Sequence, residues 1–448
     1  MKKLIYMLAA AALVSAGAVS CSDEKTDDPV EPVTVSSSMR LNGGNVLVNV
    51  PEADFDVSIP DEASSWVGVN EAETEGRTLV LEVAKNETGA ERQTTVTVTR
   101  KGRSDLLATV TIKQSNVAAK NGEFVIEEIY FTGTALPETG RPDKYQGDQY
   151  IKIRNNTDED LYADGMLLIL QSSVLSNMEG EIPAAVDFRE EYCAGQAFYA
   201  IPGSGRDVPV KAGESLIIVN NAQNHLESNP DSWDATTADF EWYDESSNEN
   251  FLDIDNPAVP NLDKWYAQTL TVHCLHNRGA HGIAIAMPPA GTTGEQFLQD
   301  HPIGDGYYYI FHSPNGSDYE TPIKGYFVPN EWVLDAVNTG GRNTFGMAPW
   351  GTSLDAGYTW CGTEDSDPDR FNKSVIRKTG ADGKLVDTNN SSNDFTPNTT
   401  PSLLAKSRLR AHRGNRPVPP ARIRRKETAN RSARSVCFFK IKELPLYA

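Results

Sequence analysis

The sequence is poor in cysteine, in basic charge and in long apolar runs. Its 448 residues include five cysteines, and 41 Lys+Arg stand against 62 Asp+Glu, for a formal net charge of −21. So few thiols exclude a dense disulfide framework. The acidic balance argues against a nucleic-acid partner, because phosphates attract a basic surface. Beyond residue 21, no apolar run approaches the roughly 18 residues that span a bilayer.

Catalytic signatures are missing as well. The sequence contains no Gly-x-Ser-x-Gly turn, no phosphate-binding Gly-x-x-x-x-Gly-Lys loop and no His-Glu-x-x-His pair. Glu127 and Glu128 are adjacent on a predicted strand, so we expect them on opposite faces and not as a working carboxylate pair. We therefore predict a protein without enzymatic activity.

The N-terminal residues have the pattern of a secretory leader. Lys2 and Lys3 form a basic start, residues 4–19 are apolar, and Ala-Val-Ser-Cys at 18–21 resembles the lipobox of bacterial lipoproteins. The resemblance implies that residues 1–21 are the lipoprotein signal and that Cys21 is acylated, with acyl chains that hold the chain to a membrane. The alternative is an ordinary signal peptide cut near Ser20.

The next segment, 22–32, is an acidic tether that contains two prolines. It resembles the export signal that sends lipoproteins of Bacteroidetes to the outer face of the outer membrane. The resemblance implies an outer-membrane, lipid-anchored protein that faces the cell exterior. A plain solvated tether is the alternative.

Residues 403–448 differ in composition from everything before them. They contain 13 Lys+Arg and two Glu, a charge of +11, whereas the mature body before them carries −34. Three interpretations stay open: translation outside the native frame, a disordered solvated tail, or a basic arm that binds an anionic partner. We assign no function to this segment.

Residues 33–115 show short alternating apolar runs separated by turn residues, which predicts a β-sandwich. The runs lie at 46–50, 55–59, 79–83, 94–98 and 108–112. Ser-Trp-Val-Gly-Val at 65–69, Asn-Glu-Thr-Gly-Ala-Glu-Arg at 86–92 and Val-Thr-Ile-Lys-Gln at 110–114 resemble a BACON domain. That family implies an immunoglobulin-like module that binds carbohydrate or mucin, or acts as a spacer. Trp66 is expected in its core and not on a sugar.

A second β-rich region follows over 120–402. Its expected strands lie at 124–131, 150–154, 164–170, 210–219 and 282–287. Val-Ile-Glu-Glu-Ile-Tyr at 125–130 and Tyr-Ile-Lys-Ile-Arg-Asn-Asn-Thr-Asp at 150–158 resemble the opening strands of a lamin-tail-like domain. Ala-Asp-Phe-Glu-Trp-Tyr at 238–243 and the segment 253–261 resemble an uncharacterised family of Bacteroidetes lipoproteins built on that domain. The fold class predicted is therefore all-β, with two immunoglobulin-like β-sandwiches in tandem, the second enlarged by long loop insertions.

The longest insertion, 220–270, is rich in aromatic residues, and such loops are usually functional or disordered. A ligand-binding platform is one interpretation, and packing of the insertion against the sandwich is the other. The candidate residues are Trp233, Trp242, Tyr243, Trp265 and Tyr266.

Two groups of residues have metal-ligand chemistry. Asp365, Asp367 and Asp369 alternate in a turn, which suits calcium, but the following residues do not match an EF-hand, and a solvated acidic loop is the alternative. His273, His276 and His281 lie close together in the sequence. Residues 269–275 are expected to form a strand, which would point His273 and His276 to opposite faces, while a turn at 277–280 could return His281 toward a partner. We predict no cofactor, with a calcium ion as the alternative.

These features favour a surface lipoprotein that binds a ligand or a protein partner. The lipoprotein resemblance suggests work beside an outer-membrane TonB-dependent transporter, with a transporter or a glycan as the partner and the membrane reached through the lipid anchor. A structural or adhesive surface protein is the first alternative. A secreted hydrolase acting on glycans is the second.

Overall fold

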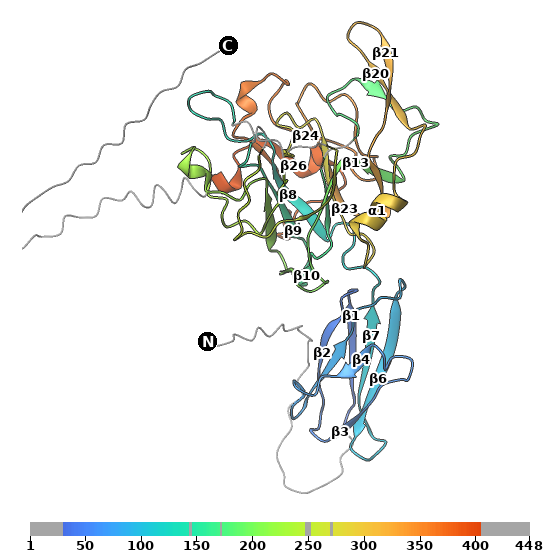
Figure 1. Cartoon of the computed structure of the whole chain (residues 1–448). Coiled ribbons are helices and arrows are strands. Elements are labelled where there is room, and N and C mark those ends of the chain that lie inside the picture. Colours follow the sequence, from blue (N-terminus) through green and yellow to red (C-terminus); the bar gives the residue numbers. More distant parts are fainter. Residues whose placement is uncertain (1–29, 143–145, 171–172, 247–251, 269–271, 405–448) are drawn as a thin grey trace, which may run out of the picture. The chain divides into compact units, whose positions relative to one another are not determined.

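The computed structural model describes residues 30–142, 146–170, 173–246, 252–268 and 272–404 (Figure 1). Cys21, most of the tether and the tail from residue 405 lie outside the described residues. Regular structure in the described part is almost all β-strand, which confirms the predicted fold class. No helix in that part is long and apolar enough to cross a membrane.

The first seven strands form a β-sandwich (blue in Figure 1). One sheet has the order β1-β7-β6-β3 and the other the order β2-β5-β4, and β1 runs parallel to β7. Alternate residues of both sheets, such as Val48, Leu81 and Val110, point into a shared core. Trp66 lies in that core with Arg92 over its ring, which confirms the expected packing. The strand bounds are β1 (Val33–Met39), β2 (Gly44–Asn49), β3 (Phe55–Ser58), β4 (Val67–Val69), β5 (Thr78–Val83), β6 (Arg92–Arg100) and β7 (Leu106–Gln114).

The second region is built on two six-stranded sheets. The first has the order β17-β16-β9-β8-β25-β26 and the second the order β18-β14-β11-β19-β23-β24. The first sheet contains β8 (Phe124–Tyr130), β9 (Tyr150–Asn155), β16 (Ser215–Val219), β17 (Phe240–Glu241), β25 (Ser374–Arg377) and β26 (Phe395–Thr399). The second contains β11 (Leu167–Leu170), β14 (Ala197–Ala200), β18 (Asp263–Ala267), β19 (Gly282–Ala286), β23 (Val333–Gly340) and β24 (Thr359–Trp360).

Smaller elements surround these sheets. Three small sheets pair β10 with β15, β13 with β22, and β12 with the hairpin β20–β21. The strand bounds are β10 (Leu161–Tyr162), β12 (Gly180–Glu181), β13 (Tyr192–Gly195), β15 (Pro209–Val210), β20 (Tyr308–His312), β21 (Asp318–Pro322) and β22 (Tyr326–Pro329). The short helices are α1 (Gly294–Asp300), α2 (Ser391–Asp394), η1 (His225–Glu227), η2 (Asn330–Trp332) and η3 (Pro368–Arg370).

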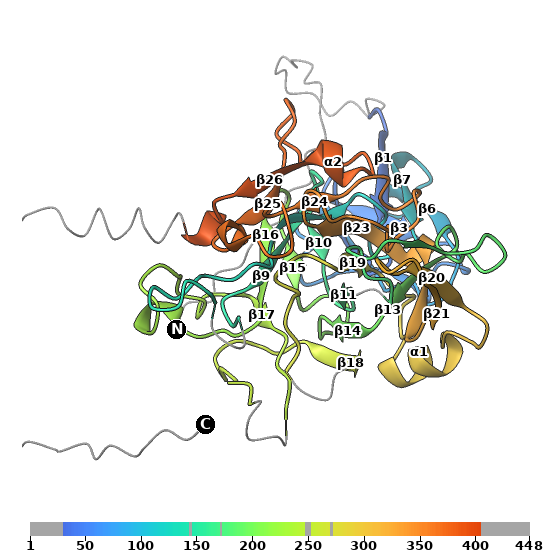
Figure 2. The same cartoon turned by 90° about the horizontal axis from the view of Figure 1, so that it is seen from above.

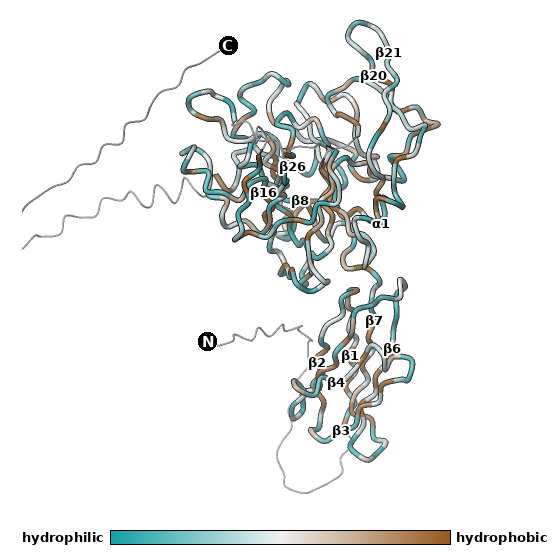
Figure 3. The backbone as a smooth tube through the Cα atoms, in the orientation of Figure 1, coloured by the Kyte–Doolittle hydropathy of each residue, from teal (hydrophilic) through white to brown (hydrophobic). Residues whose placement is uncertain are grey.

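The central strands of both six-stranded sheets are covered on both faces, which accounts for apolar strands such as β11 and β19 among the brown segments of Figure 3. The inner faces pack on each other, with Ile151 of β9 and Ile285 of β19 in their shared core. Figure 2 shows β9 and β19 from above. Insertion residues around Trp233 cover the outer face of the first sheet, together with Leu403 and Leu404. Helix α1 and strand β22 cover the outer face of the second sheet around Phe198. The insertions are therefore part of the layered core.

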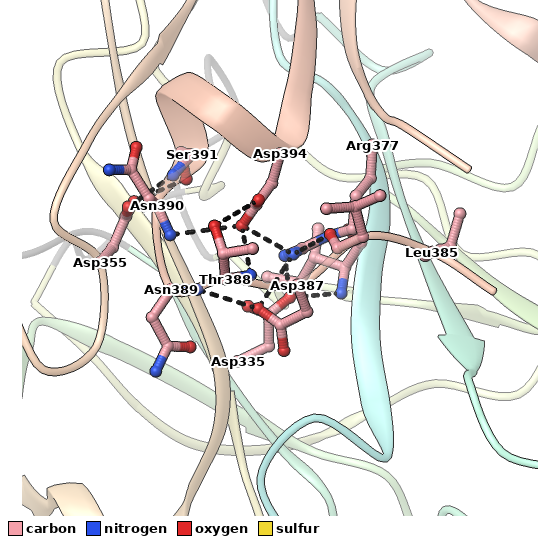
Figure 4. Close-up of polar contacts among 12 residues, drawn as sticks. Asp335, Asp355, Arg377, Leu385, Asp387, Thr388, Asn389, Asn390, Ser391 and Asp394 are labelled. Atoms are coloured by element: carbon pink, nitrogen blue, oxygen red, sulfur yellow. Dashed lines mark hydrogen bonds and ion pairs between the residues drawn. The ribbon is translucent and has the colours of Figure 1, made fainter. Parts of the chain in front are cut away.

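A buried guanidinium joins the two sheets (Figure 4). Arg377, at the end of β25, donates from Nε to the carbonyl of Ile126 at 2.8 Å and makes an ion pair with Asp335 of β23. Its Nη1 lies 3.2 Å from Oδ1 of Asp387 and 3.7 Å from Oδ2 of Asp394. Burial and the neighbouring carboxylate of Asp387 raise the pKa of Asp335 to about 7, against the lowering effect of Arg377. One cation thus balances three carboxylates from different segments.

Replacing Arg377 with Gln should destabilise the second region strongly. The change leaves Asp335 and Asp394 buried, and Asp387 partly buried, without a cation, and breaking a buried pair costs about 3–5 kcal/mol. Urea unfolding followed by far-UV circular dichroism measures the loss. Lys384→Gln is the matched control, because it removes an exposed pair with Asp158 at 2.8 Å, worth about 1 kcal/mol or less. Equal effects of the two substitutions would contradict the importance given to Arg377.

Candidate functional site

Aromatic side chains and an arginine gather where β23 and β24 end. Gly340 pairs with Trp360, and the pairing continues through a bond from Arg342 N to the carbonyl of Gly362 at 3.2 Å. The guanidinium carbon of Arg342 lies 5.3 Å from the ring centre of Trp360. Phe345 and Tyr358 stack with ring centres 4.0 Å apart and planes 7° apart. Arg342 is exposed and the three rings are half-buried. These four residues are called the Trp360 surface below.

Hydrogen bonds from exposed Ser392 and from the buried Asp355 cluster hold the backbone of this surface in place. The Tyr358 N–H donates to Oγ of Ser392 at 3.0 Å, and that hydroxyl donates to the Tyr358 carbonyl at 2.9 Å. Just before Tyr358, Gly357 N donates to Asp355, whose carboxylate also accepts a bond from Asn338 N. Ser391 N donates to the same carboxylate (Figure 4). The Tyr358 hydroxyl donates to the carbonyl of Arg342 at 3.0 Å. The backbone that carries the rings is therefore fixed before any ligand arrives.

Polar side chains border the Trp360 surface. Asn343 Nδ2 donates to Oε1 of Glu364 at 2.9 Å, and both residues are exposed. Oγ1 of Thr344 donates to Oδ1 of Asp365 at 2.8 Å, and Oδ2 of Asp365 lies 3.6 Å from Nη1 of Arg278. The border therefore offers hydrogen-bond donors and acceptors next to flat apolar rings, which suits non-covalent binding.

The predicted aromatic platform in the insertion does not form. Trp233 and Trp242 are 3% and 0% exposed and lie in different cores, one outside the first sheet and one between the sheets. Trp265 contacts Phe297 of α1 and Tyr266 contacts Tyr326 of β22, at ring distances of 5.5 and 4.7 Å. Tyr243 is half-buried. The alternative interpretation, packing of the insertion against the sandwich, describes Trp233 and Trp242, because each buries its ring and bonds its indole N–H to a backbone carbonyl.

Two of the three aspartates proposed for calcium have protein partners. Asp365 contacts Thr344, Asn177 and Arg278. Asp367 accepts bonds from the N–H groups of Thr363 and Asp369 at 2.8 and 2.9 Å and caps η3. These donors lower the pKa of Asp367. Asp369 is exposed. Within the residues described, no group of three or more His, Cys, Asp or Glu side chains is placed to hold a metal ion.

The strand expected over 269–275 is wrong for its described residues, which have no strand pairing. Side chains take the backbone groups instead. His273 N donates to Asp244, and Leu275 N and its carbonyl bond both ends of the Gln149 amide. The turn after His276 does return the chain as expected, so that the rings of His276 and His281 lie 5.0 Å apart.

Glu127 and Glu128 were expected on opposite faces, and this is also wrong. A β-bulge between Ile126 and Glu128 shifts the pairing of β8 with β9. Glu127 bonds Lys152 and Glu128 bonds Tyr150, two residues that share one face of β9. Glu128 is 0% exposed and also accepts bonds from Ser374 and from Ser402, so its carboxylate is committed to structure.

Two family models match the chain. Residues 56–115 match BACON, described as "Putative binding domain, N-terminal", and residues 211–402 match a "Protein of unknown function (DUF4876)". The first match lies inside the sandwich that carries the BACON resemblance. The second covers the insertion and the Trp360 surface.

Solved structures show weaker likeness. A DUF4876 family protein from Bacteroides thetaiotaomicron is 20% identical, with 83% of this chain and 96% of that chain covered and a TM-score of 0.49. A GH5 xyloglucanase from Bacteroides ovatus, in complex with a XXXG heptasaccharide, is 22% identical over 24% of this chain and 21% of that chain, with a TM-score of 0.16. The search of curated proteins found no match.

Acid should weaken the fold through its buried histidines. Burial lowers the pKa of His273 to about 4 from the ordinary 6.5. The unfolded chain therefore binds a proton between pH 6.5 and 4 that folded His273 does not, and roughly 3 kcal/mol of stability is lost as the pH falls through that range. Chemical denaturation at pH 7 and pH 4.5 measures the loss, which should be smaller in His273→Gln.

The loss of stability on acidification is compared between variant and wild type, because Asp335 affects it too. Its raised pKa makes the folded state bind a proton first, which adds stability as the pH falls. His312→Gln is the control. Its ring is partly exposed and pairs with Asp318 at 2.8 Å, which raises its pKa, so its removal should not reduce the acid loss. An unchanged pH dependence in His273→Gln would show that this histidine is protonated in the folded state.

Proposed function

We propose that this protein is a non-catalytic, lipid-anchored binding protein on the outer face of the outer membrane. Acylated Cys21 holds it, residues 22–32 tether it, and the second region, a lamin-tail-like domain, contacts an extracellular ligand or partner. The Trp360 surface is the contact site. The association with a TonB-dependent transporter belongs to the same proposal and rests on the lipoprotein resemblance.

The observation that carries the proposal is that Arg342 is exposed beside three half-buried rings, on a backbone held by hydrogen bonds. Aromatic rings and arginine are the residue types enriched at binding hot spots. Two hydrogen bonds between the Ser392 hydroxyl and the Tyr358 backbone hold that backbone, so little freedom is lost when a ligand binds. The match of residues 56–115 to a binding-domain model agrees with a binding protein.

The buried acids support a non-catalytic assignment. Asp244, at 0% exposure, accepts hydrogen bonds from Tyr199, Lys264 and the His273 N–H. The carboxylate of Glu128 is likewise buried and bonded to protein donors. A glycan hydrolase needs two reachable carboxyl groups flanking its substrate. The adhesive alternative differs from the proposal in requiring no discrete contact site, so the Trp360→Ala variant separates the two.

Changing Cys21 to Ser should release the protein from the membrane. Without the thiol no acyl chain is added, and the anchor that depends on several acyl chains is lost. The expected result in a Bacteroidetes host is a shift of most of the protein from the membrane to the soluble fraction. Wild-type cells treated with proteinase K should lose the full-length protein if it faces outward. Retention of Cys21→Ser in the membrane would contradict lipid anchoring.

Binding through the Trp360 surface is tested with the full mature chain as bait on outer-membrane extract. A retained barrel transporter, identified by mass spectrometry, should be at least about tenfold depleted with Trp360→Ala bait, as for a hot-spot residue. Tyr319→Ala is the matched control, since Tyr319 is 50% exposed on the hairpin β20–β21, away from this surface in sequence. Equal retention by all baits would exclude this surface as the transporter contact.

A further inference from the structure

We infer that the Trp360 surface recognises a neutral oligosaccharide made of pyranose rings. The inference rests on the proposed function and names its ligand class. A pyranose presents a C–H face to an aromatic ring and hydroxyl groups around its rim. The Trp360 surface supplies both complements, rings for the faces and planar polar side chains for the hydroxyls.

Arg342 is the group that would donate hydrogen bonds to the sugar hydroxyls. Its guanidinium carbon lies 5.3 Å from the ring centre of Trp360, within cation–π reach, so the ring favours this position of the side chain. Among the described residues, no carbonyl or carboxylate bonds this guanidinium, whereas Arg377, Arg370 and Arg278 each have oxygen partners. An exposed guanidinium beside a ring, with its donors not bonded to the described residues, can donate to a ligand oxygen.

Glu364 supplies the complementary acceptor. One of its oxygens, Oε1, takes a bond from Asn343, and the side chain is exposed beside the 340–343 segment that carries Arg342. A hydroxyl group can accept from a guanidinium and donate to a carboxylate. A carboxylate or sulfate ligand would meet Arg342 but be repelled by Glu364.

Local charge favours a neutral ligand for a second reason. Arg342 and Arg278 balance Glu364 and Asp365 at this surface, while the mature body before residue 403 carries −34. A polyanion would be repelled by the body as it approached, and a cation would find many better places on it. A neutral oligosaccharide is neither attracted nor repelled by the net charge of the protein, so its binding depends on the local rings and hydrogen-bond donors.

The sheet edge does not suit a peptide ligand. A peptide that adds a strand needs a row of backbone N–H and carbonyl groups. Strand β24, at the edge of its sheet, contains only Thr359 and Trp360. Recognition at this place must therefore depend on side chains, as saccharide binding does.

The test is a glycan array that carries neutral and acidic oligosaccharides, probed with the labelled full mature chain. We expect signal on neutral glycans, with affinity for the best of them, measured by titration calorimetry, lowered at least about tenfold in Trp360→Ala and in Arg342→Ala. The Arg342→Ala variant should fold as wild type, because the exposed Arg342 side chain makes no protein hydrogen bond among the described residues. Loss of binding in this variant therefore cannot be attributed to misfolding. Tyr319→Ala should bind as wild type.

Other outcomes overturn the inference and separate it from the proposed function. Signal confined to acidic glycans, or neutral binding unchanged in both variants, refutes a neutral-saccharide site here. A protein partner lost in Trp360→Ala, together with an array without signal, refutes the saccharide and leaves the proposed function standing. An array without signal and a bait that retains nothing through this surface would remove both.

Discussion

The contact of Arg377 with three aspartates is the interaction on which the second region depends. It is made between elements far apart in the sequence: β8 supplies a carbonyl, β23 supplies Asp335, and the segment after β25 supplies Asp387 and Asp394. A buried ion pair contributes little net stability compared with apolar packing, but each member is costly to leave alone. The cluster therefore selects one arrangement of the two sheets and of the segment after β25, here called the closing segment. Any other arrangement would leave an unpaired charge in the core.

The same closing segment positions the exposed aromatic residues. Asp394 accepts bonds from Thr388 and Asn390, which shape the loop before α2, and Ser391 and Ser392 of α2 bond Asp355 and Tyr358. A continuous chain of polar contacts thus leads from the interior to the Trp360 surface. Its geometry is set by the fold, so an incoming ligand meets rings and a guanidinium that are already in place.

Much of this fold could be predicted from apolar periodicity, because strands such as β9 and β19 bury alternate or all side chains and show it in sequence. What could not be predicted depends on tertiary partners. The bulge at Glu127 leaves no local signal, and the 272–275 segment lost its predicted strand because Gln149 and Asp244 take its backbone groups. Local pattern says which residues favour strands but not which groups of the chain will satisfy them.

The site shows the same limit more sharply. Aromatic density suggested the 220–270 insertion, yet Trp233 is buried because it covers the outer face of the first sheet, and Trp242 is buried because it packs between the two sheets. Phe345, Tyr358 and Trp360 lie in short, glycine-rich stretches with no comparable density. They stay near the surface because β23 and β24 end there. A Cβ on Gly340 would lie 3.0 Å from the ring of Phe345, a tight contact that glycine avoids. Whether an aromatic side chain is exposed depends on where the sheet that carries it ends, and the local composition of the sequence does not show that position.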